Sequence, residues 1–268
     1  MSTTKNEQLL IKTQRLPYRL VLKLLPLHTL IELRAESRLT WLRLSRRGID
    51  RRYSAAEDLL VNVGCGPNGL SGWVNIDCAA LPGVTCVRDC RTEIPLPTGS
   101  VRGIFTEHFV EHLDYYEEAP RFIAECRRVL RPGGVLRIIV PDGGRYLEAY
   151  SSGRLADMAA FSPLITMDPA SDIAPFGVEK AVLPFETKME VVNFHFRQGG
   201  QHKFSYDFET LSRLFQESGF EQVVRASYGS SRMPELAIDT ESRAAESLVV
   251  EATAPGGEFA NDVKRSGS

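Results

Sequence analysis

The sequence lacks any long hydrophobic run. None of its apolar stretches approaches the roughly 18 uncharged residues that a membrane-spanning helix needs. Its N-terminus has no apolar core followed by a small-residue cleavage site, which argues against a signal peptide. Cysteine is scarce, with five residues in 268, an odd number that does not suit a full disulfide framework. We therefore expect reduced thiols in a cytoplasmic protein.

Acidic residues are sparse in the first part of the chain. Residues 1–52 hold 12 Lys and Arg against four Asp and Glu, although the whole chain has a net charge of only −2. The apolar clusters in this basic arm could lie on an anionic membrane surface. Alternatively, the arm is a helical extension that packs on the remaining chain or on a second subunit. We expect no nucleic-acid partner, and the sequence leaves the oligomeric state open.

Short β-rich runs alternate with helical patterns from Leu59 onward, which predicts a Rossmann-like parallel sheet with crossover connections. A helix is expected over 117–130, where apolar residues recur at helical spacing and Pro120 falls in the first turn. The following R-P-G-G should end this helix before the next strand begins. The expected strands are Leu59–Val63, Trp73–Ile76, Val84–Val87, Gly103–Thr106, Val135–Val140, Glu221–Ala226 and Ser247–Ala252.

Residues 143–205 lack such order. They are rich in Pro, Gly and Ser with weak periodicity, and we interpret them as a substrate-side insertion, or lid, over the carboxyl edge of the sheet. Asp207 then suits the N-cap of a helix that Gly219 closes. The expected organisation is an arm over 1–52, one α/β domain over 53–254 and a disordered tail over 255–268.

A glycine-rich loop follows the first expected strand, yet it has no room for a helix. Gly64, Gly66 and Gly69 read G-x-G-x-x-G, but only residues 67–72 separate Gly66 from the next apolar run. Dinucleotide folds use a helix N-terminus at this place to stabilise a pyrophosphate. The glycines here therefore favour close backbone approach to a ligand without a phosphate.

Acidic residues follow two of the neighbouring strands. Ligands of open parallel sheets bind beyond the carboxyl ends of the strands, near the point where the strand order reverses. At that edge Asp77 could accept two hydrogen bonds from a ribose diol, and Asp89 one from an adenine amino group. The pattern indicates an adenosine-containing ligand, and S-adenosylmethionine has an adenosine, no phosphate and a sulfonium centre.

These residues resemble a known family, the class I S-adenosylmethionine-dependent methyltransferases of the "methyltransferase domain 11" type. The resemblance rests on N-V-G-C-G, V-N-I-D, R-D-C, F-V-E-H-L, R-V-L-R-P-G-G-V-L-R-I-I-V-P-D and F-E-T-L-S-R-L-F-Q-E-S-G-F, and it covers about residues 57–142 and 204–253. It implies a seven-stranded sheet whose last strand is antiparallel, and methyl transfer from S-adenosyl-L-methionine. Asn62 departs from the family pattern, which usually has an acid two residues before the first glycine.

The expected site contains three groups of residues. A hydroxyl acceptor would benefit from a base, and three histidines are candidates, whereas in-line positioning alone could suffice for other acceptors. The acceptor is expected to be small or medium-sized, hydroxylated or glycan-like, and methylated at oxygen. The candidate bases are His108, His195 and His202; the cofactor-binding candidates are Asn62, Gly64, Cys65, Gly66, Asp77, Asp89, Cys90 and Glu107; the substrate-side candidates are Asp142, Arg145 and Tyr146.

Other interpretations of the same residues remain. The run H-F-V-E-H has the form of a zinc-peptidase motif, but the long flanking helices that this motif needs are not expected. The spacing of Cys78, Cys86 and Cys90 matches no common zinc pattern, so these thiols are expected in the core and no metal site is predicted. A non-catalytic protein that keeps the fold for assembly or membrane association is an alternative function, and a dinucleotide-dependent oxidoreductase is a third.

Overall fold

The structure is a computed structural model that describes residues 27–153 and 185–256. The chain separates into two compact units, Met1–Arg47 and Gly48–Ser268. Helix α2 (Leu27–Ser45) belongs to the first unit, and both interpretations of the basic arm stay predictions. Most of the predicted tail and the middle of the predicted insertion lie outside the described residues. In the described parts of the chain, no helix is long and apolar enough to cross a membrane.

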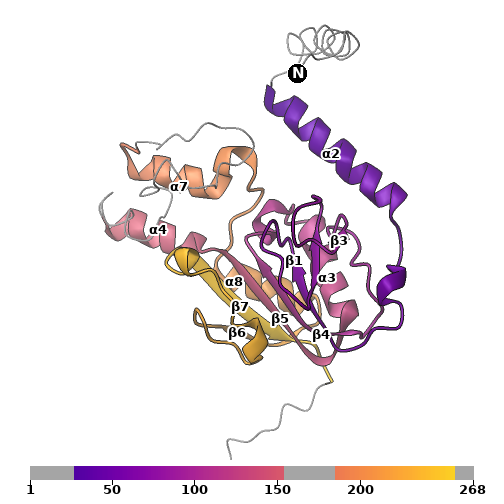
Figure 1. The fold of residues 1–268 in the computed structure, drawn as a ribbon. Coiled ribbons are helices and arrows are strands. Elements are labelled where there is room, and N and C mark those ends of the chain that lie inside the picture. The colour runs from indigo at the N-terminus through magenta and orange to yellow at the C-terminus, as the bar shows by residue number, and fades with distance from the viewer. Residues whose placement is uncertain (1–26, 154–184, 257–268) are drawn as a thin grey trace, which may run out of the picture. The chain divides into compact units, whose positions relative to one another are not determined.

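A seven-stranded sheet forms the centre of the second unit (Figure 1). Its strand order is β3-β2-β1-β4-β5-β7-β6, and β7 is antiparallel to both of its neighbours while the other pairs are parallel. This confirms the predicted Rossmann-like sheet with its last strand antiparallel. The strands are β1 (Leu59–Val63), β2 (Val74–Asp77), β3 (Cys86–Val87), β4 (Val101–Glu107), β5 (Leu130–Pro141), β6 (Glu221–Arg225) and β7 (Ser247–Thr253).

The strand order reverses between β1 and β4. These two strands run parallel, and Val63 pairs with Thr106 at their carboxyl ends. Because chain segments leave both strands at this edge, the glycine loop after β1 lies beside the turn after β4. This is the place where open α/β sheets bind ligands.

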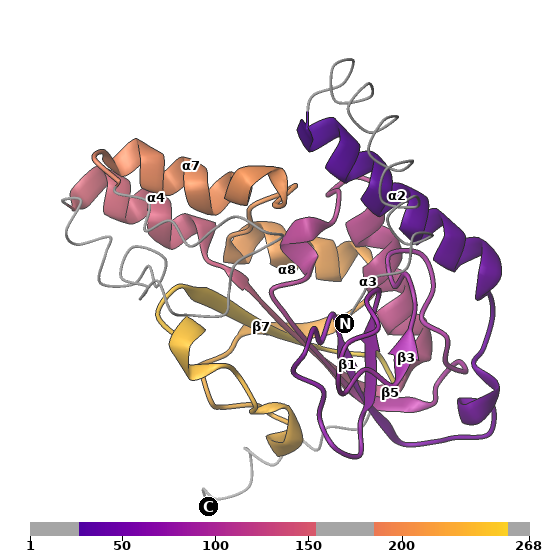
Figure 2. The same cartoon turned by 45° about the horizontal axis from the view of Figure 1, so that its top comes forward.

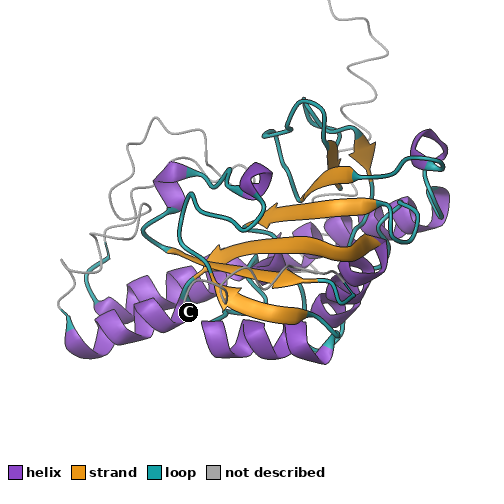
Figure 3. Ribbon diagram, turned by 90° about the horizontal axis from the view of Figure 1, so that it is seen from below, coloured by secondary structure: helices purple, strands orange, loops and turns teal. Residues whose placement is uncertain are grey.

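Helices α3 (Glu118–Val129) and α8 (Phe208–Glu217) contact each other and share one buried cluster with β1, β4 and β5. Figure 3 shows α-helices along one face of the sheet. Both helices were predicted. Pro120 lies in the first turn of α3, and the Asp207 side chain accepts the Thr210 N–H at 2.8 Å as the N-cap of α8. One boundary was wrong, because β5 begins at Leu130 and so contains the R-P-G-G segment that was expected before it.

The opposite face of the sheet has a second apolar cluster that includes Phe105, Ile139 and Leu236. The connection between β6 and β7 covers it and contains the short helix η5 (Pro234–Leu236). Within this connection, Asp239 forms an ion pair with the fully buried Arg137 of β5, which also donates to Glu251 at 2.6 Å. A buried ionic group therefore fixes this connection to the sheet.

The described ends of the insertion are helical, which corrects the expectation of weak order. Helices α4 (Gly143–Ser152) and α7 (Lys188–Arg197) lie side by side (Figure 2). Tyr146 of α4 packs with Val191 and Val192 of α7 in a separate apolar cluster, and the Lys188 Nζ donates to the Gly153 carbonyl at 2.9 Å. Only a few apolar residues pack between the two helices, so the sequence shows only a weak helical periodicity here.

Candidate functional site

The glycine loop turns sharply at the end of β1. Gly64 and Gly66 have φ angles of +69° and +53°, in the left-handed region that favours glycine. The Gly64 N–H donates to the Ile76 carbonyl at 2.8 Å. A Cβ atom on Gly64 would lie 2.8 Å from the Phe109 ring, so the loop and the turn after β4 are in close contact. Between this loop and β2 there is no α-helix, as predicted.

Asp77, at the end of β2, fixes this loop. Its Oδ2 accepts the Gly66 N–H at 2.9 Å, and its Oδ1 accepts the Ala79 N–H at 2.7 Å. Each carboxylate oxygen can accept more than one hydrogen bond. The half-buried Asp77 can therefore hold the loop and still accept hydrogen bonds from a diol.

The third glycine of the motif has a packing role. A Cβ atom on Gly69 would overlap with the backbone of Gly83. The buried Asn62 side chain donates to the Asn68 carbonyl at 3.3 Å, and so it supports the loop from the side of β1. The pattern of glycines alone gave no signal for this difference between Gly69 and the first two glycines.

Asp89 is held by a neighbour that the sequence analysis did not consider. Its carboxylate accepts from the Arg91 Nε at 2.9 Å and the Arg91 Nη2 at 3.0 Å, and Arg91 also donates to Glu118 at 2.8 Å. An adenine amino group would have to compete with Arg91 for this carboxylate. The i, i+2 spacing of the two residues was the available signal.

The two cysteines of the predicted site are buried thiols. Cys90 belongs to the main core cluster, and burial raises its pKa well above the ordinary value. Burial, together with the charge of Asp77, raises the pKa of Cys65 to about 11. Both thiols are therefore protonated at neutral pH, and Cys65 places an uncharged side chain in the glycine loop.

Glu107 is the last residue of β4, one position beyond the predicted end of this strand, and His108 begins the turn that follows, as predicted. The Glu107 Oε1 accepts the Thr240 N–H at 3.0 Å, which ties the strand to the connection before β7. His108 has a φ angle of +52°, and its Nε2 lies 3.0 Å from the Ser247 Oγ. Its Nδ1 lies 3.2 Å from the Glu111 Oε1. The ring is thus held between β7 and the turn that follows.

The H-F-V-E-H run does not form a long helix. Only the short 3-10 helix η2 (Val110–His112) occurs here, so His108 and His112 do not share a helical face. The His112 Nδ1 contacts the Gln201 carbonyl at 3.0 Å, in the segment after α7. The zinc-peptidase interpretation of this run is therefore wrong in its geometry.

The substrate-side candidates belong to the start of α4. Asp142 is the N-cap of this helix, and its side chain accepts the Arg145 N–H at 3.3 Å. Arg145 is exposed, whereas Tyr146 is fully buried and its ring stacks on His195 with 3.9 Å between centroids. Sequence reasoning did not anticipate the capping role of Asp142.

His195 lies in a buried polar group. Only 3% of it is exposed, and Glu246 accepts a hydrogen bond from the Tyr146 hydroxyl at 3.3 Å beside it. Burial lowers the pKa of His195 to about 3 and raises the pKa of Glu246. A ring with so low a pKa is a weak base at neutral pH, because it holds a proton poorly. The His202 Nδ1 lies 2.6 Å from the His195 carbonyl, and burial lowers the pKa of His202 as well.

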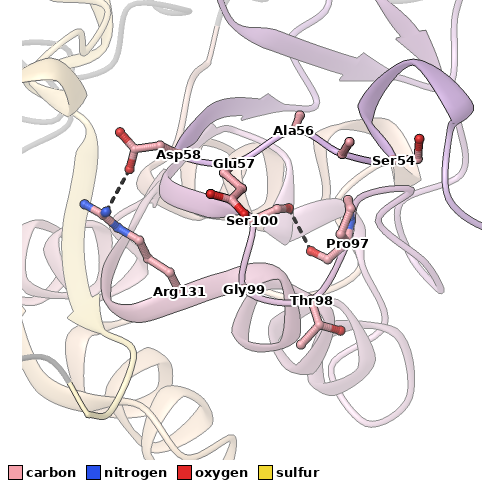
Figure 4. Close-up of a pocket in the computed structure, with 10 residues that line it drawn as sticks. Ser54, Ala56, Glu57, Asp58, Pro97, Thr98, Gly99, Ser100 and Arg131 are labelled. Atoms are coloured by element: carbon pink, nitrogen blue, oxygen red, sulfur yellow. Dashed lines mark hydrogen bonds and ion pairs between the residues drawn. The ribbon is translucent and has the colours of Figure 1, made fainter.

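A pocket lies at the other edge of the sheet (Figure 4). It is lined by residues 54–58 before β1, residues 97–100 before β4, and Arg131 near the start of β5. Asp58 and Arg131 form an ion pair of 2.8 Å at its margin. These residues precede or begin their strands, so the pocket is at the amino ends, away from the glycine loop.

The sheet order, the helix-free glycine loop and the acid at the end of β2 define a Rossmann-like protein suited to an adenosine ligand. Residues 71–138, from just before β2 into β5, match the family model of the methyltransferase domain. A probable S-adenosylmethionine-dependent methyltransferase of Mycolicibacterium smegmatis is 44% identical over 50 residues, which are 19% of this chain and 18% of that protein. Over part of its length the chain is therefore similar to S-adenosylmethionine-dependent methyltransferases, and it spans less than a fifth of the curated relative that it matches.

Solved structures give a weaker likeness. A possible histamine N-methyltransferase of Thermotoga maritima is 15% identical, with a TM-score of 0.41 over 74% of this chain and 82% of that chain. A putative methyltransferase of Haloferax volcanii, solved with a methyltransferase activator, is 11% identical, with a TM-score of 0.42 over 82% and 90%. The fold assignment therefore rests on the sheet itself.

Proposed function

We propose that this chain transfers a methyl group from S-adenosyl-L-methionine to an oxygen atom of a small or medium-sized hydroxylated acceptor. The observation that carries the cofactor part is the Asp77 carboxylate, which holds the Gly66 N–H while retaining acceptor capacity toward a ribose diol. The cofactor, when bound, supplies the methyl group on a sulfonium, a good leaving group.

The loop suits this cofactor better than a dinucleotide. Backbone N–H groups at a helix N-terminus are the usual partners of a pyrophosphate. Residues 64–73 offer no such helix, and the neutral Cys65 thiol and the Phe109 ring border the turn instead. A ligand with a sulfonium and no phosphate does not need the backbone N–H groups of a helix N-terminus at this loop.

The acceptor part rests on the polar groups at the carboxyl edge. His108 directly follows β4. The exposed Arg145 lies in the first turn of α4, which begins two residues after the end of β5. Holding the acceptor atom in line with the methyl group and the sulfonium can contribute roughly 7–11 kcal/mol of the barrier reduction. A hydroxyl acceptor must in addition lose its proton, and of the three candidate bases we propose His108, because burial lowers the pKa of both His195 and His202.

Calorimetry with S-adenosylhomocysteine and NAD, side by side, tests the cofactor assignment. We expect binding of S-adenosylhomocysteine only. Asp77→Ala removes two charge-assisted hydrogen bonds, each worth about 1.5–3 kcal/mol, so affinity should fall roughly 10²–10⁴-fold. Asp58→Ala is the matched control, because that carboxylate lies at the other edge of the sheet.

Two outcomes would contradict the assignment. Binding of NAD without S-adenosylhomocysteine would reject the methyltransferase function, and unchanged affinity in Asp77→Ala would reject the ribose contact. Because Asp77 also supports the loop, adenosine and 2′,3′-dideoxyadenosine should be compared as competitors. The wild type should discriminate between them and Asp77→Ala should not. Incubation of extracts with labelled cofactor then identifies the acceptor, and a product methylated at nitrogen or carbon would refute the oxygen assignment.

A further inference from the structure

Two segments about 90 residues apart meet beside the turn after β4. The N–H groups of Lys203 and Phe204 donate to the Glu111 carbonyl, at 2.8 and 3.3 Å. This pairing brings His202 next to Glu111 and His112. One possible ligand atom from each of these three side chains lies within 4.8 Å of the other two. They form a cluster of two imidazoles and one carboxylate.

Both histidines of the cluster have a fixed tautomer. The His112 Nδ1 lies 3.0 Å from the Gln201 carbonyl, and the His202 Nδ1 lies 2.6 Å from the His195 carbonyl. A carbonyl oxygen can only accept, so each Nδ1 carries the hydrogen. In the neutral rings, each Nε2 then keeps its lone pair. A backbone carbonyl that holds the other ring N–H is the usual outer partner of a metal-binding histidine.

The Glu111 carboxylate is buried without adequate partners. The residue is 1% exposed, and among the described residues neither of its oxygens has a hydrogen-bond partner. The His108 Nδ1 lies 3.2 Å from Oε1, and this contact does not count among the hydrogen bonds of the carboxylate. Burial of a carboxylate is costly unless it is paired or coordinates a cation. This side chain therefore points to a ligand that brings positive charge.

We propose that Glu111, His112 and His202 bind a divalent transition metal ion of the zinc type. Imidazole nitrogen and carboxylate oxygen are zinc ligands, whereas Mg²⁺ and Ca²⁺ prefer sites made of oxygen alone. Three protein ligands leave a fourth position for water or another oxygen atom. His108 is not a ligand in this arrangement, although its Nδ1 lies 3.2 Å from the Glu111 Oε1.

The proposal does not depend on methyl transfer. The glycine loop contacts Phe109, and two of the three metal ligands, Glu111 and His112, follow two and three residues later. The loop and the metal cluster are therefore neighbours, but they use separate side chains. A metal titration therefore tests this cluster whatever the cofactor does.

The test uses the full-length protein, stripped with a chelator that is then removed. The exposed Cys78 is replaced by serine throughout, because a free thiol is itself a metal ligand. Zn²⁺ is titrated by calorimetry, and Co²⁺ by the visible absorption of its bound form. The variants are Glu111→Gln, His112→Phe and His202→Phe, and His28→Phe in the other compact unit is the matched control.

We expect one Zn²⁺ per chain in the parent and in His28→Phe, with a rise in the thermal unfolding midpoint. Each ligand variant should lose more affinity than the roughly 10–100-fold that follows loss of an outer partner. Both phenylalanine variants keep a ring at a partly exposed position, so they test the site even if Glu111→Gln does not fold. The proposal would be overturned if the parent did not bind Zn²⁺ stoichiometrically, or if His112→Phe and His202→Phe bound Zn²⁺ as tightly as the parent.

Discussion

Replacement of Arg137 by methionine should destabilise the protein strongly. The side chain is fully buried in β5 and donates to Asp239 and Glu251, whose side chains are each 2% exposed. It also donates to the carbonyls of Ser227 and Ser230. Methionine has a similar length but leaves the Asp239 carboxylate buried without its cation, and leaves Glu251 with Arg232 alone, whose Nε lies 3.7 Å from Oε2. Removal of one partner from a buried ion pair costs about 3–5 kcal/mol, a large part of the roughly 5–15 kcal/mol that folded domains possess.

Chemical denaturation measures this change directly. The midpoint should fall while the slope with denaturant stays constant, since the surface exposed on unfolding is the same. Arg213→Met is the matched control, because Arg213 is 72% exposed and pairs with Glu217 at the surface, where loss costs about 1 kcal/mol or less. The triple change Arg137→Met, Asp239→Asn, Glu251→Gln should recover part of the loss. If Arg137→Met is as mild as Arg213→Met, the buried ionic group does not hold the β6–β7 connection.

Two further outcomes are expected. Gly64→Ala should destabilise more than Gly66→Ala in unfolding experiments, because both have positive φ but only the first places a Cβ 2.8 Å from Phe109, and Phe109→Ala should remove the difference. Equal losses, or no relief by Phe109→Ala, would refute that contact. In the folded protein Cys78 should react with iodoacetamide well before Cys65, which is buried and has a pKa raised to about 11; faster labelling of Cys65 would refute its burial.

The two proposals can fail separately. Glu111→Gln should weaken Zn²⁺ without abolishing the binding of S-adenosylhomocysteine, and Asp77→Ala should do the reverse. The nearest connection between the sites is the Phe109 ring, which contacts Gly64 and precedes the metal-binding turn. Loss of both ligands in both variants would mean that the two segments form one site.

Much of the fold was encoded locally in the sequence. The helices at 118–129 and 208–217 have their apolar residues on one face, and Asp207 marks the start of the second. The loop after β1 was recognisable because too few residues separate it from β2 for a helix. Periodicity, caps and loop lengths concern residues that are near each other along the chain, so they can be read without the fold.

Tertiary structure decided which polar side chains meet. Arg137 finds Asp239 and Glu251 more than 100 residues away, and His202 joins Glu111 across about 90 residues. The same holds for α4 and α7, whose shared apolar contacts appear only when the two helices pack. Such groups form where segments that are distant in sequence pack against each other, and a buried charge is stable only where it is paired with groups from those segments. A local pattern of residues does not show which distant segments come into contact. The candidate metal cluster could therefore be recognised only in the folded chain.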